Sequence, residues 1–435
     1  MAAIPGSPVG MDAADAEHAV SPARAGVEPN EPTEPEAWAI LLAASGLGPA
    51  GFGALLAAFG SGTGILNAAG RPGAAARFAR IAAEADGRPA FGTDVGRAIV
   101  ATAAARDEHL GQLRASGLRV MSLDDPAYPA RLRTIEMPPP VLLVRGSTAS
   151  LSARRSVAIV GTRHPTERGR LLAARIAGAV SGAGATVISG LAVGIDGAAH
   201  AAAVADDRPT IAVLGSGHER LFPRAHVKLA TLIVEHEGAV ISEFWPWMPP
   251  SKHTFPRRNR LISALADATI VVEAGVRSGA LITAKFALEQ GRDLFIVPGG
   301  LDEPRSAGCL TWLRDLPGEA RIVAHIAGLI EDLGLLAAAN EPATASSRGE
   351  RSGRPRRPSL AAELIEVGPT AAAVGRALVA GNGSLDELVA TTGLEPAAVL
   401  GAITLLELRG LATSTYGRYR AAGRLASAPP EATAT

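Results

Sequence analysis

Cysteine, lysine and aromatic residues are scarce in this chain of 435 residues. The single cysteine, Cys309, excludes an intrachain disulfide and a cysteine-based zinc cluster, which favours a cytoplasmic location. No uninterrupted apolar run reaches the roughly 18 residues of a membrane-spanning helix, so no membrane segment is expected. The first residues also lack the charged and apolar regions of a signal peptide, and Met1 and Met11 remain alternative starts.

An excess of charge of either sign is missing as well, since 42 basic residues balance 42 acidic ones. A neutral chain has no global attraction to nucleic acid, so any site for a polyanion must be local. One segment meets that condition. The stretch "SKHTFPRRNR" at 251–260 holds four cations and no acid, and an apolar segment follows it directly.

The motifs of several cofactor and metal sites are absent. The chain has no GxxxxGK[ST], no HExxH, and no GxGxxG after its first predicted buried strand. Asp196 and His200 stand four residues apart, and we interpret them as a capping carboxylate and a packed imidazole rather than a metal pair. Cys309 has no neighbouring base in the sequence. No catalytic residue, metal or cofactor is therefore predicted.

Composition divides the chain into six segments. The predicted segments are a disordered tail (1–35), a helical SAM/helix-hairpin-helix-like domain (36–115), an α/β domain (116–333), a flexible basic linker (334–368), a winged-helix domain (369–424) and a second disordered tail (425–435). In the helical domain, Gly48 followed by Pro49 predicts a tight turn that opens a helix. An ordinary helix–helix turn is favoured over a phosphate-gripping hairpin, because no Lys or Arg stands near it.

Six short β-rich runs alternate with helical stretches in the α/β domain. They are continuously apolar, as expected for strands buried on both faces of a parallel sheet. The runs are "SVAIVG" (156–161), "ATVISG" (185–190), "TIAVLG" (210–215), "GAVISE" (238–243), "ATIVVEA" (268–274) and "DLFIVPG" (293–299). The predicted fold is a Rossmann-like, doubly wound α/β domain with a mainly parallel sheet.

Glycine-rich loops follow the first three of these runs. Ligands of open α/β sheets bind outside the carboxyl ends of the strands, and glycine lets backbone N–H groups approach an anion. We therefore expect a phosphate cradle, although glycine at such corners can also serve only to turn the chain. The expected cradle residues are Gly161, Thr162, Arg163, Gly190, Gly194, Gly215 and Gly217.

The basic stretch lies in the connection between the fourth and fifth runs. A right-handed crossover begins at the carboxyl edge, so Arg257, Arg258 and Arg260 are expected to start a helix at the rim of the cradle. Arg257 and Arg260 are three apart and share a helical face, whereas Arg258 points elsewhere. A solvated charged turn is the alternative interpretation.

Further cations and two aromatic residues flank this region. Arg224 and Lys285 are expected to approach the cradle, and Trp245 and Trp247 precede the basic stretch. Arginines beside aromatic rings suit a single-stranded polyanion, with its backbone on the cations and its bases on the rings.

The C-terminal segment has the pattern of a winged helix. Ser384 and Glu387 have the spacing of a capping box, Gly393 turns the chain into a second helix, and a hairpin is expected around Gly417. The expected recognition helix carries only Arg409 as a cation. We therefore favour a protein-contact module and keep DNA binding as the alternative.

The order of several motifs resembles the DNA processing protein A family (DprA, also called Smf). The motifs are "SVAIVGTRHPTERG", "VISGLAVGIDGAAHAAAV", "TIAVLGSGHERLFPRAH", "VISEFWPWMPPSKHTFPRRNRLISAL", "IVVEAGVRSGALITAKFALEQGRDLFIVPG" and "SAGC". The resemblance covers roughly 116–310 closely. It implies a protein, not known as an enzyme, that binds single-stranded DNA, protects incoming strands in natural transformation, loads the RecA recombinase and forms a homodimer.

The family's functional residues fall on three motifs of this chain. The resemblance implies DNA contacts by Gly161-Thr162-Arg163, by Arg224, and by the segment that holds Phe255, Pro256, Arg258, Asn259 and Arg260. Arg257 is a cation that the family pattern does not include.

Two other classes of function stay open at this point. A nucleotide-processing enzyme of a related Rossmann-like superfamily would use the carboxylates of Glu243, Glu273 and Asp196, which are expected near the carboxyl edge of the sheet. A winged-helix regulator would use the α/β domain to sense a ligand.

Overall fold

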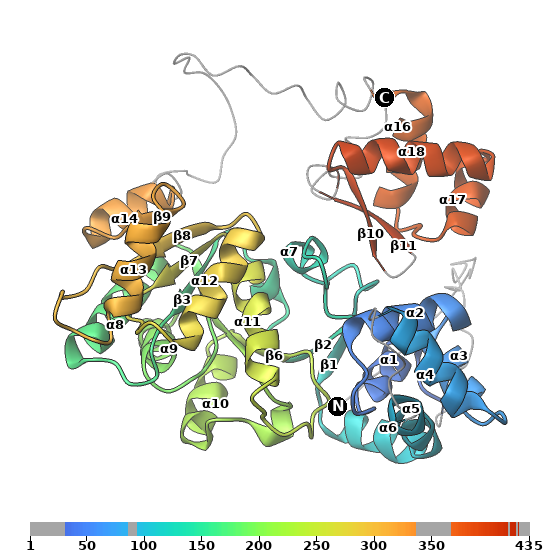
Figure 1. Ribbon diagram of the computed structural model, residues 1–435, viewed down its shortest axis with the longest axis horizontal. Helices are drawn as coiled ribbons and strands as arrows, with labels where there is room; N and C mark the ends of the chain where they lie inside the picture. Colours follow the sequence, from blue (N-terminus) through green and yellow to red (C-terminus); the bar gives the residue numbers. More distant parts are fainter. Residues whose placement is uncertain (1–30, 86–93, 336–366, 416–417, 423–424, 426–435) are drawn as a thin grey trace, which may run out of the picture.

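The computed structural model shows a helical N-terminal region, a central α/β domain and a winged-helix domain (Figure 1). Most of the expected tails and linker lie outside the described residues, and helix α1 begins at Glu34, inside the tail that was expected to extend to residue 35. The structure describes residues 31–85, 94–335, 367–415, 418–422 and 425.

The α/β domain is built on one nine-stranded sheet of order β1-β2-β6-β5-β4-β3-β7-β8-β9. Strands β3 to β9 run parallel to their neighbours, and β1 and β2 form an antiparallel extension beside β6. The strands are β1 (Arg119–Ser122), β2 (Val141–Gly146), β3 (Ser156–Val160), β4 (Thr186–Ser189), β5 (Thr210–Val213), β6 (Ala239–Ser242), β7 (Ala268–Val271), β8 (Asp293–Ile296) and β9 (Ala320–Ile322).

The six predicted runs are the strands β3 to β8, so the expected mainly parallel sheet is confirmed. Their continuous apolar character has the expected cause, because both faces of the sheet are covered. Along β3, Val157 and Ile159 join one hydrophobic cluster, whereas Ala158 and Val160 join another. Strands β1, β2 and β9 were not among the predicted runs.

Helices cover the two faces of the sheet (Figure 1). One face carries α8 (Glu167–Gly182), α9 (Ile195–Ala205), α10 (Val227–Glu235) and α14 (Ile326–Asp332). The other carries α11 (Thr254–Leu265), α12 (Gly279–Glu289) and α13 (Ala307–Asp315), with α7 (Ala130–Arg133) packed on α11. Short 3-10 turns are η1 (Ala149–Ser152), η2 (His218–Arg220) and η3 (Arg224–His226).

Strand β3 lies between β4 and β7, and the order of connections reverses there. From β3 the chain first builds β4, β5 and β6 on one side and then crosses to β7, β8 and β9 on the other. Such a reversal separates the loops that leave neighbouring strands and opens a crevice at the carboxyl ends. The crevice is therefore expected beside the loops that follow β3 and β7.

The N-terminal helices pack against the antiparallel end of the sheet. Gly48 caps α2 and Pro49 is its first residue, as predicted for a turn that opens a helix. Helix α1 contacts both β1 and β2, and its Trp38 belongs to the same hydrophobic cluster as the sheet. The helices are α1 (Glu34–Leu41), α2 (Pro49–Phe59), α3 (Gly62–Ala68), α4 (Ala74–Ala85), α5 (Asp94–Ala104) and α6 (Arg106–Ala115).

In its described residues, the C-terminal domain has three helices and a hairpin, as expected for a winged helix. They are α16 (Pro369–Val379), α17 (Leu385–Thr392), α18 (Pro396–Leu408), β10 (Ala412–Thr415) and β11 (Arg418–Ala421). The predicted capping box of Ser384 and Glu387 is present, and Gly393 ends α17 in the left-handed conformation. A guanidinium of the hairpin, that of Arg420, donates to the Asp124 carboxylate of the α/β domain at 2.6 Å.

No single helix within the described ranges is long and apolar enough to cross a membrane, although the bent pairs α2–α3 and α17–α18 each pass that test together by length and composition.

The capping box predicts a measurable contribution to the stability of α17. Glu387 accepts hydrogen bonds from the backbone N–H groups of Ser384 and Gly383, and these bonds lower the pKa of its carboxyl below 4.5. Ser384→Ala should lower the free energy of unfolding of α17 by about 1 kcal/mol. Amide exchange across 384–392, measured by mass spectrometry, should then be about fivefold faster than in wild type.

The capping box should also make the stability of α17 depend on pH. Because the pKa of Glu387 is lower in the folded state, its stabilising effect is complete above the unfolded pKa and is lost as pH falls through the folded pKa, below 4.5. Glu387→Gln should weaken α17 at neutral pH and remove this dependence. The exposed Asp386→Asn in the same turn is the control, and equal exchange in all variants would contradict the capping role.

Candidate nucleic-acid interface

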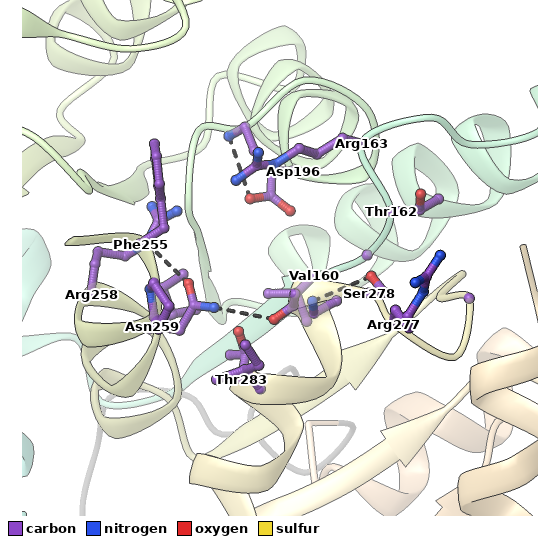
Figure 2. Close-up of a pocket in the computed structure, with 18 of the residues that line it drawn as sticks. Val160, Thr162, Arg163, Asp196, Phe255, Arg258, Asn259, Arg277, Ser278 and Thr283 are labelled. Atoms are coloured by element: carbon purple, nitrogen blue, oxygen red, sulfur yellow. Dashed lines mark hydrogen bonds between the residues drawn. The ribbon is translucent and has the colours of Figure 1, made fainter. Parts of the chain in front are cut away.

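A pocket of about 940 Å³ opens at the expected crevice, beside the loops that follow β3 and β7. We name it the cationic pocket, because its charged lining residues are five cations and a single carboxylate, that of Asp196. Figure 2 shows that the labelled side chains reach it from several separate elements. Its cations are Arg163 after β3, Lys252 and Arg258 around α11, Arg277 after β7 and Arg305 after β8.

Arg163 and two phenylalanine rings form the accessible side of this pocket. The Arg163 guanidinium carbon lies 5.1 Å from the centroid of the Phe255 ring, and the residue is exposed to solvent. Phe222 meets Phe255 edge to face, with ring centroids 5.9 Å apart, and Phe222 is 45% exposed. A guanidinium and an exposed ring side by side can contact a phosphate and a base at once.

Arg258 forms part of the floor of the cationic pocket, its buried inner side, and is only 3% exposed. Its Nη1 donates to the carbonyl of Gly190 at 2.6 Å and to the carbonyl of Val213, which follow β4 and end β5. Burial lowers the pKa of Arg258 to about 10, so the side chain remains charged at neutral pH. Arg258 therefore joins two neighbouring strand ends and supplies a buried positive charge to the floor.

Asp196 is a buried carboxylate whose negative charge interacts with the positive charge of Arg258. Its Oδ2 accepts hydrogen bonds from the N–H groups of Gly190 and Ala192, at 3.2 and 3.4 Å. Burial raises the pKa of Asp196, and the nearby Arg258 opposes that rise. His200, four residues on, bonds to the hydroxyl of Thr210, and burial lowers its pKa to about 3. Both residues make structural contacts, and His200 is packed as predicted, but Asp196 holds the loop before α9 and does not cap that helix, whose N-cap is Gly194.

The expectation of a cradle of free N–H groups is wrong at three positions. The N–H of Thr162 donates to the carbonyl of Glu273 at 2.7 Å, that of Gly190 to Asp196, and that of Gly217 to the carbonyl of Met248 at 2.9 Å. Protein groups have already satisfied these donors, so they are not oriented toward a ligand. Of the five predicted glycines, only Gly161 lines the cationic pocket.

The glycines instead allow close packing of the residues that form the floor. A Cβ on Gly190 would lie 2.5 Å from Nη1 of Arg258, and a Cβ on Gly215 would lie 2.5 Å from Cδ1 of Phe255. Gly194 has a φ of +89°, and a Cβ there would lie 2.4 Å from the carbonyl oxygen of Thr162. These loops need glycine for steric reasons.

Arg257 and Arg260 share a helical face as predicted, but that face is turned away from the cationic pocket. Both donate to Oε2 of the buried Glu243, and Arg260 also donates to the carbonyl of Met137. The expectation that all three arginines rim the site is therefore corrected. Arg258 lines the pocket together with Asn259, whereas Arg257 and Arg260 are paired with a carboxylate outside it.

The other two predicted cations also lie outside the cationic pocket. Arg224 lines a neighbouring cavity, and the exposed Lys285 forms an ion pair with Glu289 at 3.6 Å. The expected role is wrong for Trp245, which is buried in the core against Trp247 and against His109, whose ring lies 5.1 Å away. Trp247 is partly exposed but does not line the cationic pocket. The aromatic rings that line this pocket are those of Phe222 and Phe255.

Sequence reasoning missed three of the five pocket cations as site residues. Lys252 lies in the basic stretch but was not assigned to the site, and Arg277 and Arg305 follow the carboxyl ends of β7 and β8. The rule that ligands bind at carboxyl ends would have found the last two, had it been applied to these strands as well as to the first three.

Two side chains that could take part in catalysis, those of Glu273 and Cys309, are buried in the packed interior. Glu273 accepts from the N–H and hydroxyl of Thr166 at 3.0 and 2.7 Å, and so holds the start of α8. Burial raises the pKa of the Cys309 thiol to about 11. Within the described part of the chain, no group of three His, Cys, Asp or Glu side chains could hold a metal ion.

Comparison with known proteins gives a consistent family. Residues 119–334 match the model of DNA recombination-mediator protein A, and residues 358–418 match that of the DprA winged helix domain. A putative DNA processing protein DprA of Mycobacterium tuberculosis is 36% identical over 328 residues, which are 72% of this chain and 79% of that protein.

Two solved structures are also similar. DNA processing protein A of Streptococcus pneumoniae is 29% identical, with a TM-score of 0.49 over 62% of this chain and 95% of that one. The protein of Helicobacter pylori, described for its single-stranded DNA binding mode, is 29% identical, with a TM-score of 0.45 over 50% of this chain and 97% of that one. By its two family matches and its curated relative, the chain belongs to the DNA processing protein A (DprA/Smf) family.

Proposed function

We propose that this chain binds single-stranded DNA in the cationic pocket without selecting bases. The observation that carries the proposal is the concentration of five cations, against one carboxylate, at one edge of the sheet of a chain with no net charge. Arg163, Lys252, Arg277 and Arg305 are all exposed and can reach phosphates. Electrostatic contacts of this kind give affinity that does not depend on sequence.

Single strands fit this site better than a duplex. Phe222 and Phe255 expose ring surface between the cations, and a ring can stack only on a base whose face is not covered by neighbouring base pairs, as in a single strand. Stacking tolerates every base, because each has a π face. The site therefore needs no hydrogen-bonding groups aimed at base edges.

We further propose that the chain acts in DNA processing during natural transformation and recombination, where it protects strands and passes them to RecA. The support is membership of the family together with the motifs that carry the resemblance. A cytoplasmic homodimer that binds rather than catalyses is part of the same proposal. The engaged state of Glu243, Glu273 and Asp196 favours binding over nucleotide chemistry.

The winged-helix domain is proposed as a protein-contact module. Helix α18 occupies the place of a recognition helix, and its range Pro396–Leu408 contains no Lys or Arg. Leu400, Leu405 and Leu408 are instead exposed on it, the last at 78%. An apolar exposed surface suits a protein partner and offers little to a phosphate backbone.

Loss of Arg163 should weaken single-strand binding without harming the fold. Arg163→Ala removes an exposed charge and should raise the Kd for oligo-dT about tenfold to a hundredfold, as expected for a charge-assisted contact. The slope of log K against log salt should fall by about 0.7. Fluorescence anisotropy measures both quantities. Arg170→Ala, an exposed cation on α8 that pairs with Glu167, is the control, and wild-type binding by Arg163→Ala would refute the site.

Loss of Arg258 should affect both binding and stability. Arg258→Ala leaves the carbonyls of Gly190 and Val213 without their donor, at a cost of about 1–3 kcal/mol per buried group. Urea unfolding should therefore show a lower midpoint for this variant and an unchanged one for Arg163→Ala. An unchanged midpoint in both variants would show that Arg258 does not hold the strand ends together.

A transfer to RecA can be tested by its ATP hydrolysis on single-stranded DNA. Adding this chain to the DNA first should shorten the lag before hydrolysis begins, and the Arg163→Ala variant should shorten it less because it holds less DNA. A lag that this chain leaves unchanged or lengthens would contradict the proposed transfer and leave the DNA site itself standing.

A further inference from the structure

One end of the cationic pocket is formed by the start of helix α12 (Figure 2). Ser278 caps this helix, Gly279 is its first residue, and Thr283 lies one turn further along it. All three line the pocket, and we name them the α12 end. The first N–H groups of a helix have no partner within the helix, and the helix dipole adds partial positive charge there. The proposed function places phosphates on the exposed cations and gives the α12 end no role.

The N–H of Gly279 is available to a ligand. The N–H of Ala280 donates to the Ser278 hydroxyl oxygen at 3.3 Å, and that of Leu281 donates to the Ser278 carbonyl at 3.1 Å. The N–H of Gly279, by contrast, has no acceptor among the described residues. A Cβ on Gly279 would meet no neighbouring atom within 4 Å, so packing does not require this glycine as it does the glycines of the floor. The space in front of this N–H is open.

Thr283 supplies a second donor that the protein does not use. The residue is only 1% exposed, yet its hydroxyl forms no hydrogen bond with any described residue. Figure 2 shows the hydroxyl oxygen on the pocket side of the helix, between Asn259 and Val160. Side chains of a helix lean toward its N-terminus, which brings this hydroxyl toward the start of α12. Because buried hydroxyls are normally hydrogen-bonded, this one points to an external acceptor.

The charges around these donors favour an anion. Arg277 directly precedes Ser278 and is exposed to solvent. The one carboxylate in the pocket lining, that of Asp196, is engaged by two N–H groups of the loop after β4. The α12 end therefore offers a backbone N–H, two hydroxyls and a helix dipole to the oxygen atoms of an acceptor. Helix N-termini with such donors are sites for phosphate.

The depth of the α12 end selects the kind of phosphate. Thr283 is almost completely buried, whereas the cations Arg163 and Lys252 are exposed at the rim. A phosphodiester within a strand continues on both sides, so its deep insertion would pull two neighbouring nucleotides into the pocket. A terminal phosphate has one covalent connection and can reach the floor while the strand passes over the rim. It also carries a charge of about −1.5 to −2 at pH 7, more than a diester.

We propose that the α12 end binds the terminal phosphate of a single strand whose other phosphates lie on the exposed cations of the pocket. The phosphate oxygens accept from the N–H of Gly279 and from the hydroxyls of Ser278 and Thr283. Neutral donors, rather than a further ion pair, thus distinguish the end of a strand from its middle. This inference rests on the proposed single-strand binding and adds recognition of a phosphorylated strand end.

The test uses oligo-dT of about ten nucleotides, a length within the range of single-strand sites. Strands with a 5′-phosphate, a 3′-phosphate or hydroxyls at both ends compete with a labelled strand in fluorescence anisotropy. One of the two phosphorylated strands should bind wild type about tenfold more tightly than the hydroxyl strand, as expected for hydrogen bonds to a charged group. A hydroxyl strand one nucleotide longer has as many phosphates as the phosphorylated strands, and it should bind as the shorter hydroxyl strand does.

Three variants locate the effect. Thr283→Val keeps the branched shape and removes only the hydroxyl, so it should abolish the preference for the phosphorylated end and leave binding of the hydroxyl strand unchanged. Thr283→Ser restores the hydroxyl and should restore the preference. Thr269→Val is the matched control, because Thr269 is a fully buried threonine of β7 whose hydroxyl also has no partner in the described chain but does not line the pocket. It should bind every strand as wild type does.

The outcomes separate this inference from the proposed function. Equal affinity of wild type for phosphorylated and hydroxyl strands overturns the terminal site and leaves single-strand binding intact. A preference that Thr283→Val retains also overturns it, because the added charge alone would then account for the preference. The same holds if Thr283→Val weakens all strands equally, since Thr283 would then serve the whole strand. If wild type binds no strand, the proposed function fails together with this inference.

Discussion

The buried guanidinium of Arg258 is the contact on which the arrangement of the site depends. It bonds to carbonyls at the ends of two adjacent parallel strands, and Asp196 pins the loop after β4 from the other side. Removing a charge of this kind from water is costly unless hydrogen bonds and an opposite charge compensate it. Here both are present. Phe255, on the same helix, packs against Gly215 after β5, whereas the loop that carries Arg163 is held separately by the carbonyl of Glu273.

The same helix uses its arginines in two ways. Arg258 and Asn259 face the pocket, whereas Arg257 and Arg260 share the buried Glu243. The basic stretch is therefore less cationic toward solvent than its sequence suggests. Most of the exposed positive charge of the pocket comes from loops after β3, β7 and β8, and these loops make one edge of the sheet cationic in a chain without net charge.

The sheet could be predicted because a strand buried on both faces leaves a continuous apolar run, which is a local property of the sequence. The N–H cradle could not, because the carbonyls that accept from Thr162 and Gly217 belong to Glu273 and Met248, which lie 111 and 31 positions further along the chain. Helical spacing correctly grouped Arg257 with Arg260, but spacing alone does not say which face of a helix meets a ligand.

The glycines that admit Arg258 and Phe255 have a consequence for how such a protein can change. Because no side chain can be added at Gly190 or Gly215 without displacing the floor, those positions offer no route to a different affinity. Lys252, Arg277 and Arg305 carry no such steric constraint from the floor, and each can be exchanged alone. The affinity for a ligand can thus change through these exposed side chains, while the packing of the floor residues stays the same.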